Sequence, residues 1–500
     1  MVQPKKGGIL RYVPPSEILG LDPIATTQYM TGHHALLVYD FLFQYDNENI
    51  PQPQMVDEWS VSADGLTWNF TLRDGLAFHD GRPVDSEDVV VSLMRWAKKN
   101  SYGLLLAQVT NEWKTVDAKT FQLSLKEPFG LLLDALSQPT IPAAVMPKEE
   151  ARLGPNDVAS SNIGSGPFKF VQWTPGVGLS YVRNNDYQPR SEPASGYAGG
   201  KVVYLDGLEW HIMPEPSTKI PALETARVDF VDWGPPDLYD RINANPEIEV
   251  FYDQHGTSNL TYLNKVVPPF NDVRARRAVQ TATDQKAYLG AAYPEKSTLP
   301  CKAMFGCGTR WETFVGADEV GAFSGDIEKA RELWDQVYDG RPIRVITPTD
   351  RAEYHNLAVV TRELLEKLGA KVEPLPIDTP TFAALYRNPE ATARGEWHIG
   401  HVGSIQSVDP VTHSGTNPGF LGGPNVHPRL QELKVAFVKA TAEAELREII
   451  DEYQRVNYAN PEFVYLGVSR RYKAHRSDVK GVIRAPTRTY QVFWNMWLDR

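Results

Sequence analysis

Apolar and polar positions alternate most regularly between residues 51 and 96. Apolar side chains occupy every second position from residue 68 to 72, which is the period of a strand with one buried face. Asp-Gly pairs on both sides of this run predict turns, and a short further strand is expected at residues 76–78. Asp85 then stands in an N-cap position, and residues 89–96 repeat an apolar face with the helical period. We therefore expect strands and turns that lead into a capped helix.

Strand and helix patterns alternate in the second half of the chain. Residues 260–264 are a predicted strand. Residues 361–368 have one apolar face and end at Gly369, a residue favoured where helices end. Residues 372–375 form the next predicted strand. This order is typical of an α/β lobe with parallel strands.

Length and composition change this picture only slightly. Five hundred residues exceed one ordinary core and predict two or three lobes. With 42% hydrophobic and 23% charged residues, the chain is an ordinary globular one, and no apolar run approaches the length of a membrane span. A formal net charge of -11 argues against a nucleic-acid partner, which usually meets a basic face.

Motifs for catalysis are missing from the sequence. It contains no Gly-x-Ser-x-Gly elbow, no His-Glu-x-x-His and no Cys-x-x-Cys. The Gly164-Ser165-Gly166 turn is not followed by the Gly-Lys-Ser/Thr of a phosphate loop. We therefore expect no enzymatic activity and no cofactor.

Histidines near residue 400 are the best candidates for a metal site. His398, His401 and His413 lie close to Asp409, and imidazoles suit nickel, zinc and copper. Residues three apart on a strand face opposite sides, so direct chelation by His398 and His401 together is disfavoured. Scattered polar side chains are the simpler interpretation. The alternative is a metal chelate held by one histidine, His401 or His413.

Several separated segments carry a family resemblance. They are residues 53–59 (PQMVDEW), 64–70 (DGLTWNF), 72–75 (LRDG), 78–84 (FHDGRPV), 268–278 (PPFNDVRARRA) and 326–333 (DIEKAREL). In this order they resemble the extracytoplasmic solute-binding proteins of the peptide/nickel/opine class (family 5), which serve ABC importers. The resemblance extends over nearly the whole chain.

The resemblance implies an α/β fold of the two-lobed periplasmic-binding-protein type (type II, large cluster C) with an extra inserted small domain. Its expected boundaries are residues 1–45, 161–258 and 480–500 for lobe I, 46–160 for the inserted domain, and 259–479 for lobe II.

The implied function is capture of a small organic solute by lobe closure and delivery to an ABC permease in the membrane. A monomeric periplasmic protein whose export signal has been removed is expected. Binding of a peptide, an opine or a metal chelate by the same fold remains open. A periplasmic hydrolase and a periplasmic chaperone or receptor-presenting module are the alternatives from other classes, and the missing motifs disfavour the hydrolase.

Eight residues are candidate solute contacts, on their type and on the loops that the resemblance assigns to the binding cleft. They are Tyr29, Trp96, Trp233, Trp397, His401, Ser404, Gln406 and His413. The helical spacing of Trp96 fits a core residue equally well. Tyr29 and Trp233 could likewise cover a core edge.

Residues 400–410 test the peptide alternative. Peptide binders of this family resemble Gly-Trp-x-x-Asp-Tyr-x-Asp-Pro here, and the first Asp neutralises the peptide amine. Anchored on Asp409-Pro410, that acidic position falls on Gln406 and the Tyr position on Ser407. Because a buried ammonium without a carboxylate is costly, a standard free-amine peptide is disfavoured. Residues 396–420 should hold the information on the cargo.

Cys301 and Cys307 are the two cysteines of the chain. Their spacing leaves a disulfide and two free thiols equally open. The importer resemblance favours the disulfide, since it places the protein in an oxidising compartment.

Overall fold

A seven-stranded mixed sheet and a six-stranded mixed sheet are the centres of two units in the computed structural model, which describes residues 3–154, 157–417, 426–485 and 490–500. The first unit comprises Met1–His255 and Arg471–Arg500, and the second comprises Gly256–Arg470. The chain therefore passes between the units twice.

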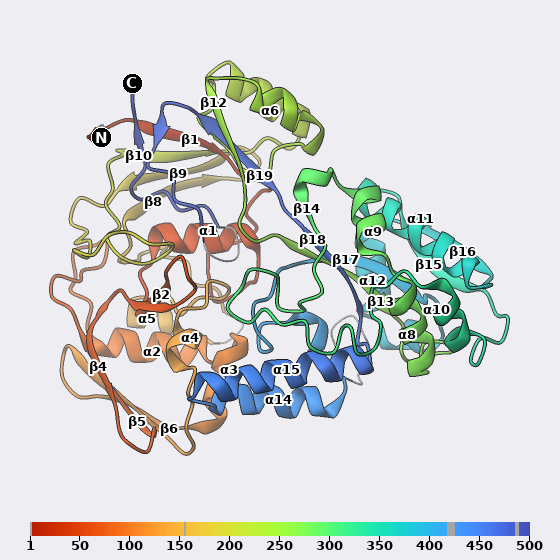
Figure 1. Cartoon of the computed structure of the whole chain (residues 1–500). Coiled ribbons are helices and arrows are strands. Elements are labelled where there is room, and N and C mark those ends of the chain that lie inside the picture. Colours follow the sequence, from red (N-terminus) through yellow and green to blue (C-terminus); the bar gives the residue numbers. More distant parts are fainter. Residues whose placement is uncertain (1–2, 155–156, 418–425, 486–489) are drawn as a thin grey trace. The chain divides into compact units, whose positions relative to one another are not determined.

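The sheet of the first unit has the strand order β12-β19-β11-β1-β10-β9-β8 (Figure 1). Strands β10, β1 and β11 are parallel, and the other pairings are antiparallel. Because β1 and β11 run in the same direction, their carboxyl ends lie at the same edge of the sheet. The strands are β1 (Ile9–Val13), β8 (Phe168–Thr174), β9 (Gly178–Arg183), β10 (Gly207–His211), β11 (Phe230–Val231), β12 (Ile248–Tyr252) and β19 (Tyr472–Arg476).

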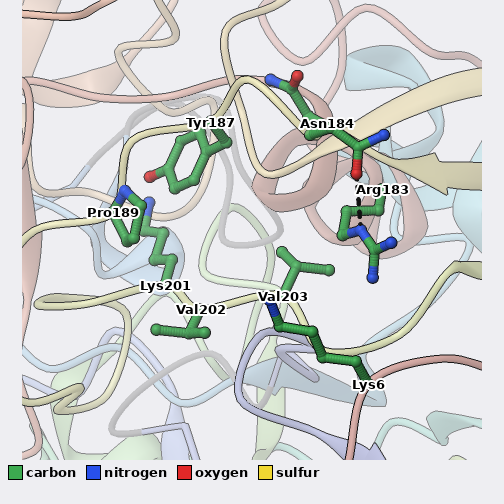
Figure 2. Close-up of a pocket in the computed structure, with 9 residues that line it drawn as sticks. Lys6, Arg183, Asn184, Tyr187, Pro189, Lys201, Val202 and Val203 are labelled. Atoms are coloured by element: carbon green, nitrogen blue, oxygen red, sulfur yellow. Dashed lines mark hydrogen bonds between the residues drawn. The ribbon is translucent and has the colours of Figure 1, made fainter.

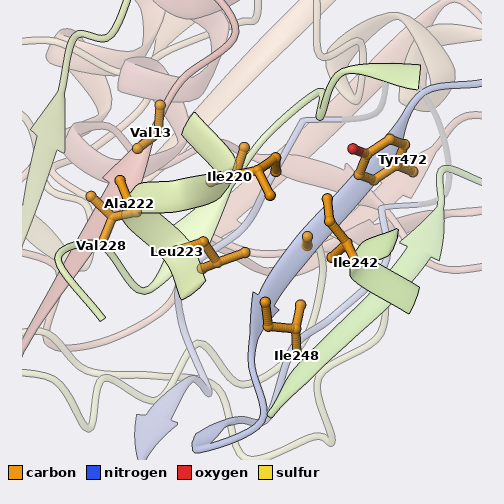
Figure 3. Packing of buried hydrophobic residues seen from close by; sticks show 10 residues of the cluster. Val13, Ile220, Ala222, Leu223, Val228, Ile242, Ile248 and Tyr472 are labelled. Carbon is orange, nitrogen blue, oxygen red and sulfur yellow. The ribbon is translucent and has the colours of Figure 1, made fainter. Parts of the chain in front are cut away.

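Helices α1 (Tyr29–Val38), α6 (Pro216–Glu224) and α7 (Tyr239–Asn243) belong to this unit. Figure 3 shows Ile220 and Leu223 of α6 packed against the sheet, together with Ile242 of α7. These side chains are buried, and burial of an aliphatic side chain stabilises by about 1.5–3 kcal/mol. Helix α6 is thereby fixed over β1, β11 and β19. A small pair, β20 (Val479–Lys480) and β21 (Trp497–Leu498), follows near the C-terminus.

A separate four-stranded antiparallel sheet, ordered β4-β5-β7-β6, occupies the segment expected as an inserted domain. Strand β5 covers the predicted strand, with Trp68, Phe70 and Leu72 buried. Asp85 caps α2, because its side-chain oxygen accepts hydrogen bonds from the backbone N–H groups of Glu87 and Asp88. The elements are β2 (Phe43–Tyr45), β3 (Pro51–Pro53), β4 (Val56–Val61), β5 (Thr67–Leu72), β6 (Thr110–Thr115), β7 (Thr120–Leu125), α2 (Ser86–Trp96), α3 (Ser101–Val109), α4 (Leu132–Leu136) and α5 (Lys148–Ala151).

The strand expected at residues 76–78 is reduced to a single bridge between Ala77 and Pro83. The chain turns back at Asp80-Gly81 after one rung, so no ladder can form. The segment is a tight loop instead.

The second unit has a sheet with the strand order β14-β18-β13-β17-β15-β16. Strand β15 runs parallel to both β16 and β17, and the other pairings are antiparallel. The predicted helix at residues 361–368 is the second half of α11, and Gly369 follows it in a left-handed conformation (φ 86°). The strands are β13 (Thr257–Leu263), β14 (Thr298–Leu299), β15 (Ile343–Pro348), β16 (Val372–Ile377), β17 (Ile399–Ile405) and β18 (Val464–Ser469).

Helices cover the sheet of the second unit, and α11 packs on β15 and α9. They are α8 (Val273–Ala282), α9 (Gln285–Ala292), α10 (Ile327–Trp334), α11 (Ala352–Lys367), α12 (Thr379–Tyr386), α13 (Pro389–Ala393), α14 (Pro428–Lys439) and α15 (Glu443–Ala459). Short 3-10 turns lie at Pro236–Leu238, Glu295–Ser297 and Ser414–Thr416.

The observed unit boundaries differ from the expected ones. The return to the first lobe, expected at residue 480, occurs at Arg471, because β19 pairs with β11 and β12 of the first sheet. The first crossing, expected after residue 258, follows His255. The expected inserted domain of residues 46–160 has a sheet of its own within the first unit.

Candidate functional site

Aromatic side chains gather at the carboxyl edge of the first unit's sheet. Tyr29 begins α1 and Trp233 is the second residue after β11, and their ring centroids are 5.0 Å apart. Tyr490 lies 5.0 Å from Tyr29 on another side. The guanidinium carbon of Arg471 stands 5.4 Å from the centre of the Trp233 ring. Tyr29 and Trp233 are half-buried, so they can contact a solute without leaving their packing.

Left-handed backbone at Trp233 (φ 52°) turns the chain sharply where β11 ends. Such a conformation is uncommon for a bulky residue and marks strain that its surroundings maintain. Ends of parallel strands are where ligands bind in open α/β sheets. Trp233 and Tyr29 therefore lie together at such an edge, and their role as solute contacts stays a prediction.

The second unit contains a pocket of about 230 Å³ at the corresponding edge of its own sheet. Strand β15 ends at Pro348, and helix α12 follows strand β16. Strand β17 runs parallel to β15, continues beyond its end and forms one wall of the pocket. The lining residues are Pro348, Arg351, Tyr354, Thr379, Phe382, Ala383, Tyr386, His401, Val402, Gly403 and Ser404. The pocket thus combines three aromatic rings with a few polar groups, the usual composition of a small-molecule site.

His401 is fixed at the base of this pocket. Its two ring nitrogens lie 3.1 Å from the hydroxyl of Thr261 and 3.0 Å from that of Thr361. Burial lowers the pKa of His401 to about 3, so the ring is neutral at physiological pH. His401 therefore contributes shape and polarity to the pocket but no charge.

Arg351 is the charged residue among the side chains that line the pocket. Its Nε donates to Glu353 Oε1 at 3.0 Å, and its guanidinium carbon lies 4.6 Å from the centre of the Tyr354 ring. The contacts with Glu353 use Nε and Nη2, so among the described residues Nη1 on the other side of the guanidinium remains for a ligand. With a side chain 39% exposed, Arg351 remains accessible at the rim.

The family model of the bacterial extracellular solute-binding proteins, family 5 (Middle), matches residues 51–419. This chain belongs to that family. A probable peptide ABC transporter periplasmic-binding protein (y4tO) of Sinorhizobium fredii is 33% identical, and the alignment covers 95% of this chain and 91% of that protein. The glutathione-binding protein GsiB of Pectobacterium atrosepticum is 23% identical, over 94% and 90% of the two chains.

Solved structures of family 5 share the fold. The periplasmic binding protein AgaA of A. tumefaciens R10, in complex with agropinic acid, superposes with a TM-score of 0.78 at 22% identity, and each chain is covered to 99%. NikA of Brucella suis, in complex with Fe(III)-EDTA, gives 0.79 at 16% identity, over 98% of this chain and 100% of that one. This chain is therefore a two-lobed α/β binding protein and the solute-binding component of an ABC importer.

Gln406 and His413 lie in the segment after β17, and both are buried. His413 stacks on Phe463 at 5.0 Å, and burial, with a smaller effect of Lys434, lowers its pKa to about 3. Within the described residues, Gln406 Nε2 and His413 Nδ1 have no hydrogen-bond partner. Gln406 Nε2 can donate a hydrogen bond, and His413 Nδ1 can donate or accept one depending on the tautomer.

The disulfide between Cys301 and Cys307 is present and closes a loop against this segment. Phe305 meets the His413 ring edge-on at 6.0 Å. Gly306 approaches Gln406 so closely that a Cβ there would lie 1.6 Å from Nε2. The disulfide loop thus holds the predicted contact segment in place.

Two of the predicted aromatic contacts lie in cores. Trp96 is fully buried, and its indole N–H donates to Ile141 O at 3.0 Å. Trp397 is also buried and packs edge-on against Phe382, which itself lines the pocket. Trp96 has no exposed surface with which to meet a solute, and Trp397 supports the pocket wall from behind.

Asp409 does not face the pocket of the second unit. Its Oδ1 accepts hydrogen bonds from the backbone N–H groups of Val411 and Thr412, both at 2.8 Å, and this closes a turn. The predicted cargo segment continues to residue 420, and its residues 418–420 lie outside the described part of the chain.

The candidate metal ligands do not come together. His398 Nδ1 accepts the backbone N–H of Arg344 at 3.0 Å, whereas His401 contacts two threonines. Among the described residues, no group of three or more His, Cys, Asp or Glu side chains could hold a metal ion. Likewise, no helix in the described segments is long and apolar enough for a membrane span.

A second pocket of about 230 Å³ lies in the first unit beside β9 (Figure 2). The buried ammonium of Lys201 is paired with Asp40 at 2.9 Å, and Arg183 is 3.2 Å from Asp206. Arg183 Nε also donates to Asn185 at 2.9 Å, the dashed line of Figure 2. Lys201 and Arg183 are ion-paired, as Arg351 is with Glu353, and Lys6 is a third cation of this pocket. The pocket of the second unit is the better candidate because it combines its cation with three aromatic rings at the carboxyl end of β15.

Sequence reasoning missed Arg351, Tyr354 and the α12 residues Phe382 and Tyr386. Arg351 precedes α11 and follows the carboxyl end of the buried strand β15 by three residues. Such a position beyond a strand's carboxyl end is typical of ligand contacts, and it could have identified Arg351 from the sequence. Helix α12 gave no signal, because its apolar residues fit a core face equally well.

Proposed function

We propose that this protein captures a small organic solute outside the cytoplasm and that the solute carries a carboxylate beside an apolar body. The solute is then delivered to the permease of an ABC importer. The observation that carries this proposal is the charge of the second unit's pocket. Arg351 is cationic and His401 is neutral, and none of the pocket-lining residues is an Asp or Glu.

Arg351 suits a carboxylate because a planar guanidinium donates directed hydrogen bonds to that group. Tyr354, Phe382 and Tyr386 supply apolar surface for the remainder of the solute. Opine-type carboxylates meet this description, and AgaA was solved with agropinic acid. A peptide is the second candidate, because y4tO is named as a probable peptide-binding protein. Gln406 at the amine-binding position favours the first.

Further parts of the proposal rest on the family and on the chain's chemistry. Tyr29 and Trp233 offer a second contact surface, and lobe closure around the solute is the expected mechanism of capture. Location in the periplasm agrees with the names of the relatives and with the Cys301–Cys307 disulfide. We expect a monomer that carries no cofactor and performs no chemistry on its solute.

Native mass spectrometry of the purified protein should first identify a co-purified solute. Calorimetry then compares that solute, or a library carboxylate, with its carboxamide analogue. Because a charge-assisted hydrogen bond contributes about 1.5–3 kcal/mol, Arg351→Gln should weaken carboxylate binding roughly 10- to 100-fold. The matched control is Arg362→Gln, an arginine on the same helix that lies outside this pocket.

Two results would contradict the proposal. Equal affinity for the carboxylate and the carboxamide would remove the role assigned to Arg351. Tight binding of free-amine peptides, lost when the amine is blocked, would move the assignment to the peptide class.

A further inference from the structure

Two crossing segments are joined at the point where they leave the first unit. The chain leaves this unit after His255 and re-enters it at Arg471. Strands β12 and β19 pair up to the last rung, where Tyr252 lies opposite Tyr472, and Asp253 N–H donates to Arg471 O at 3.0 Å. Asp253 therefore lies where both crossing segments meet the first sheet.

Three charged side chains are buried behind this rung. Lys473 Nζ lies 3.3 Å from Asp253 Oδ1 and 3.6 Å from Asp232 Oδ1. Asp232 and Lys473 are almost inaccessible, and Asp253 is 6% exposed. Two carboxylates thus share one ammonium group in a site that is nearly dry.

The other side chains around these carboxylates do not balance the second negative charge. Tyr12 on β1 donates its hydroxyl to Asp232 Oδ2 at 2.6 Å. Lys219 on α6 donates to Pro14 O at 3.2 Å. Burial keeps the pKa of Asp232 raised, and the charge of Lys219 lowers it less than that of Lys473 does. His33 on α1 is neutral, because burial and then Lys473 lower its pKa well below the ordinary value. Tyr29 on α1 also lies near, and its charge adds to the rise that burial and Asp232 cause in the pKa of Tyr12. Arg471 contributes its backbone oxygen to Asp253 N–H.

A buried pair of like charges is relieved when one carboxylate takes up a proton. Within the described residues, Asp232 Oδ1 and Asp253 Oδ2 have no hydrogen-bond partner, so each has room for that proton. Burial raises the pKa of Asp253 to about 7, and the Asp232 carboxylate adds to the rise while Lys473 opposes it. Burial also raises the pKa of Asp232.

We propose that Asp232, Lys473 and Asp253 form a proton-holding triad where both crossing segments meet the first unit, and that uptake of the solute is coupled to uptake of a proton by this triad. The coupling rests on the proposed solute-binding function. Trp233 adjoins Asp232 in the sequence, and Arg471 lies over the Trp233 ring. A solute that covers this edge removes the remaining water at Asp253 and makes the second negative charge of the triad more costly. Binding therefore favours the protonated form.

Calorimetry of solute binding between pH 6 and 8.5, in buffers with different ionisation enthalpies, measures this coupling. We expect the protein to take up protons when the solute binds. The affinity should fall at least threefold from pH 6.5 to 8.5. This is less than the limit for one linked proton, which is a tenfold change per pH unit. Asp253→Asn should bind the solute with less than a 1.5-fold change over the same range and without proton uptake.

The control is Asp229→Asn. Asp229 is also buried in the first unit, and it is ion-paired with Arg11 and Arg500. Burial would raise its pKa, but hydrogen bonds from both arginines outweigh that effect and lower it, so Asp229 stays ionised throughout the range. This variant should keep the pH dependence of the native protein. An unchanged pH slope in Asp253→Asn would overturn the proposal.

Thermal unfolding without solute tests the triad independently of the proposed solute. With a raised pKa, Asp253 holds its proton in the folded state after the unfolded chain has lost it, so its contribution to stability falls as pH rises from about 4 to 7. The Tm of Asp253→Asn relative to the native protein should rise by several degrees between pH 5 and 8. A constant difference would refute the triad itself, whereas a rising difference without proton-coupled binding would refute only its link to the solute.

Discussion

Replacing Gly306 by alanine should show whether the disulfide loop positions Gln406. Gly306 and Gly308 both have left-handed backbone, with φ of 94° and 76°. An alanine at either position pays a similar backbone penalty, on the order of 1 kcal/mol. The surroundings differ, because a Cβ at 306 would lie 1.6 Å from Gln406 Nε2, whereas nothing lies within 4 Å at 308. Gly308→Ala is thus a matched control.

The extra cost at position 306 follows from what Gln406 must give up. Its side chain is buried, and its Oε1 accepts the backbone N–H of Gly256 at 3.3 Å. Moving the amide breaks that hydrogen bond, worth about 1 kcal/mol, and forces neighbours apart, for about 1 kcal/mol more. We therefore expect Gly306→Ala to lower the free energy of unfolding by about 2 kcal/mol more than Gly308→Ala does.

Urea unfolding of both variants, in native and Gln406→Ala backgrounds, forms a double-mutant cycle. Without the Gln406 side chain, the excess cost at position 306 should disappear. Equal destabilisation by the two glycine variants, or an excess that survives in the Gln406→Ala background, would refute the contact as the cause.

Two further predictions concern the second unit. Removing the disulfide with the double variant Cys301→Ala, Cys307→Ala should lower the free energy of unfolding by about 2 kcal/mol. This is the loop-entropy value for a sequence separation of 6. Urea unfolding of both proteins under non-reducing conditions measures the difference, and an unchanged midpoint would contradict the prediction. Acidification should destabilise the unit through His401 and His413, whose pKa values of about 3 lie below the ordinary 6.5 of the unfolded chain. The stabilisation by these neutral histidines is complete above pH 6.5 and is lost as pH falls towards 3, by about 2 kcal/mol per histidine at pH 5. Urea unfolding at pH 7 and 5 should show that the double variant His401→Gln, His413→Gln loses less stability between these pH values than the native protein does.

Sequence reasoning identified the parts whose structure is locally determined. The run from Trp68 to Leu72 and the capped helix at Asp85 formed as expected, because alternation and N-capping act over a few residues. The disulfide loop also formed as the resemblance implied. The family followed from ordered segments, and a family-model match over residues 51–419 confirms it.

Long-range pairing was less accessible from the sequence. The unit boundary at Arg471 depends on β19 pairing with β11 and β12, which precede it by more than two hundred residues. Trp96 and Trp397 are buried because their exposure depends on how α2 and the residues before β17 pack, which residue type and the family resemblance do not determine. Arg351 was missed for the same reason, since its position at the pocket rim depends on the parallel pairing of β15, β16 and β17.

In the pocket of the second unit, different residues determine the shape and the charge. Its size and shape come from Phe382, Tyr386 and a histidine fixed by two threonines, all on regular elements. Its charge comes from Arg351, at a helix start, because His401 is held neutral by burial. Under the proposed function, a substitution at Arg351 would change which solute charge is accepted. The family match over residues 51–419 consequently establishes the class of protein, whereas in our proposal the cargo depends on a few side chains at strand ends.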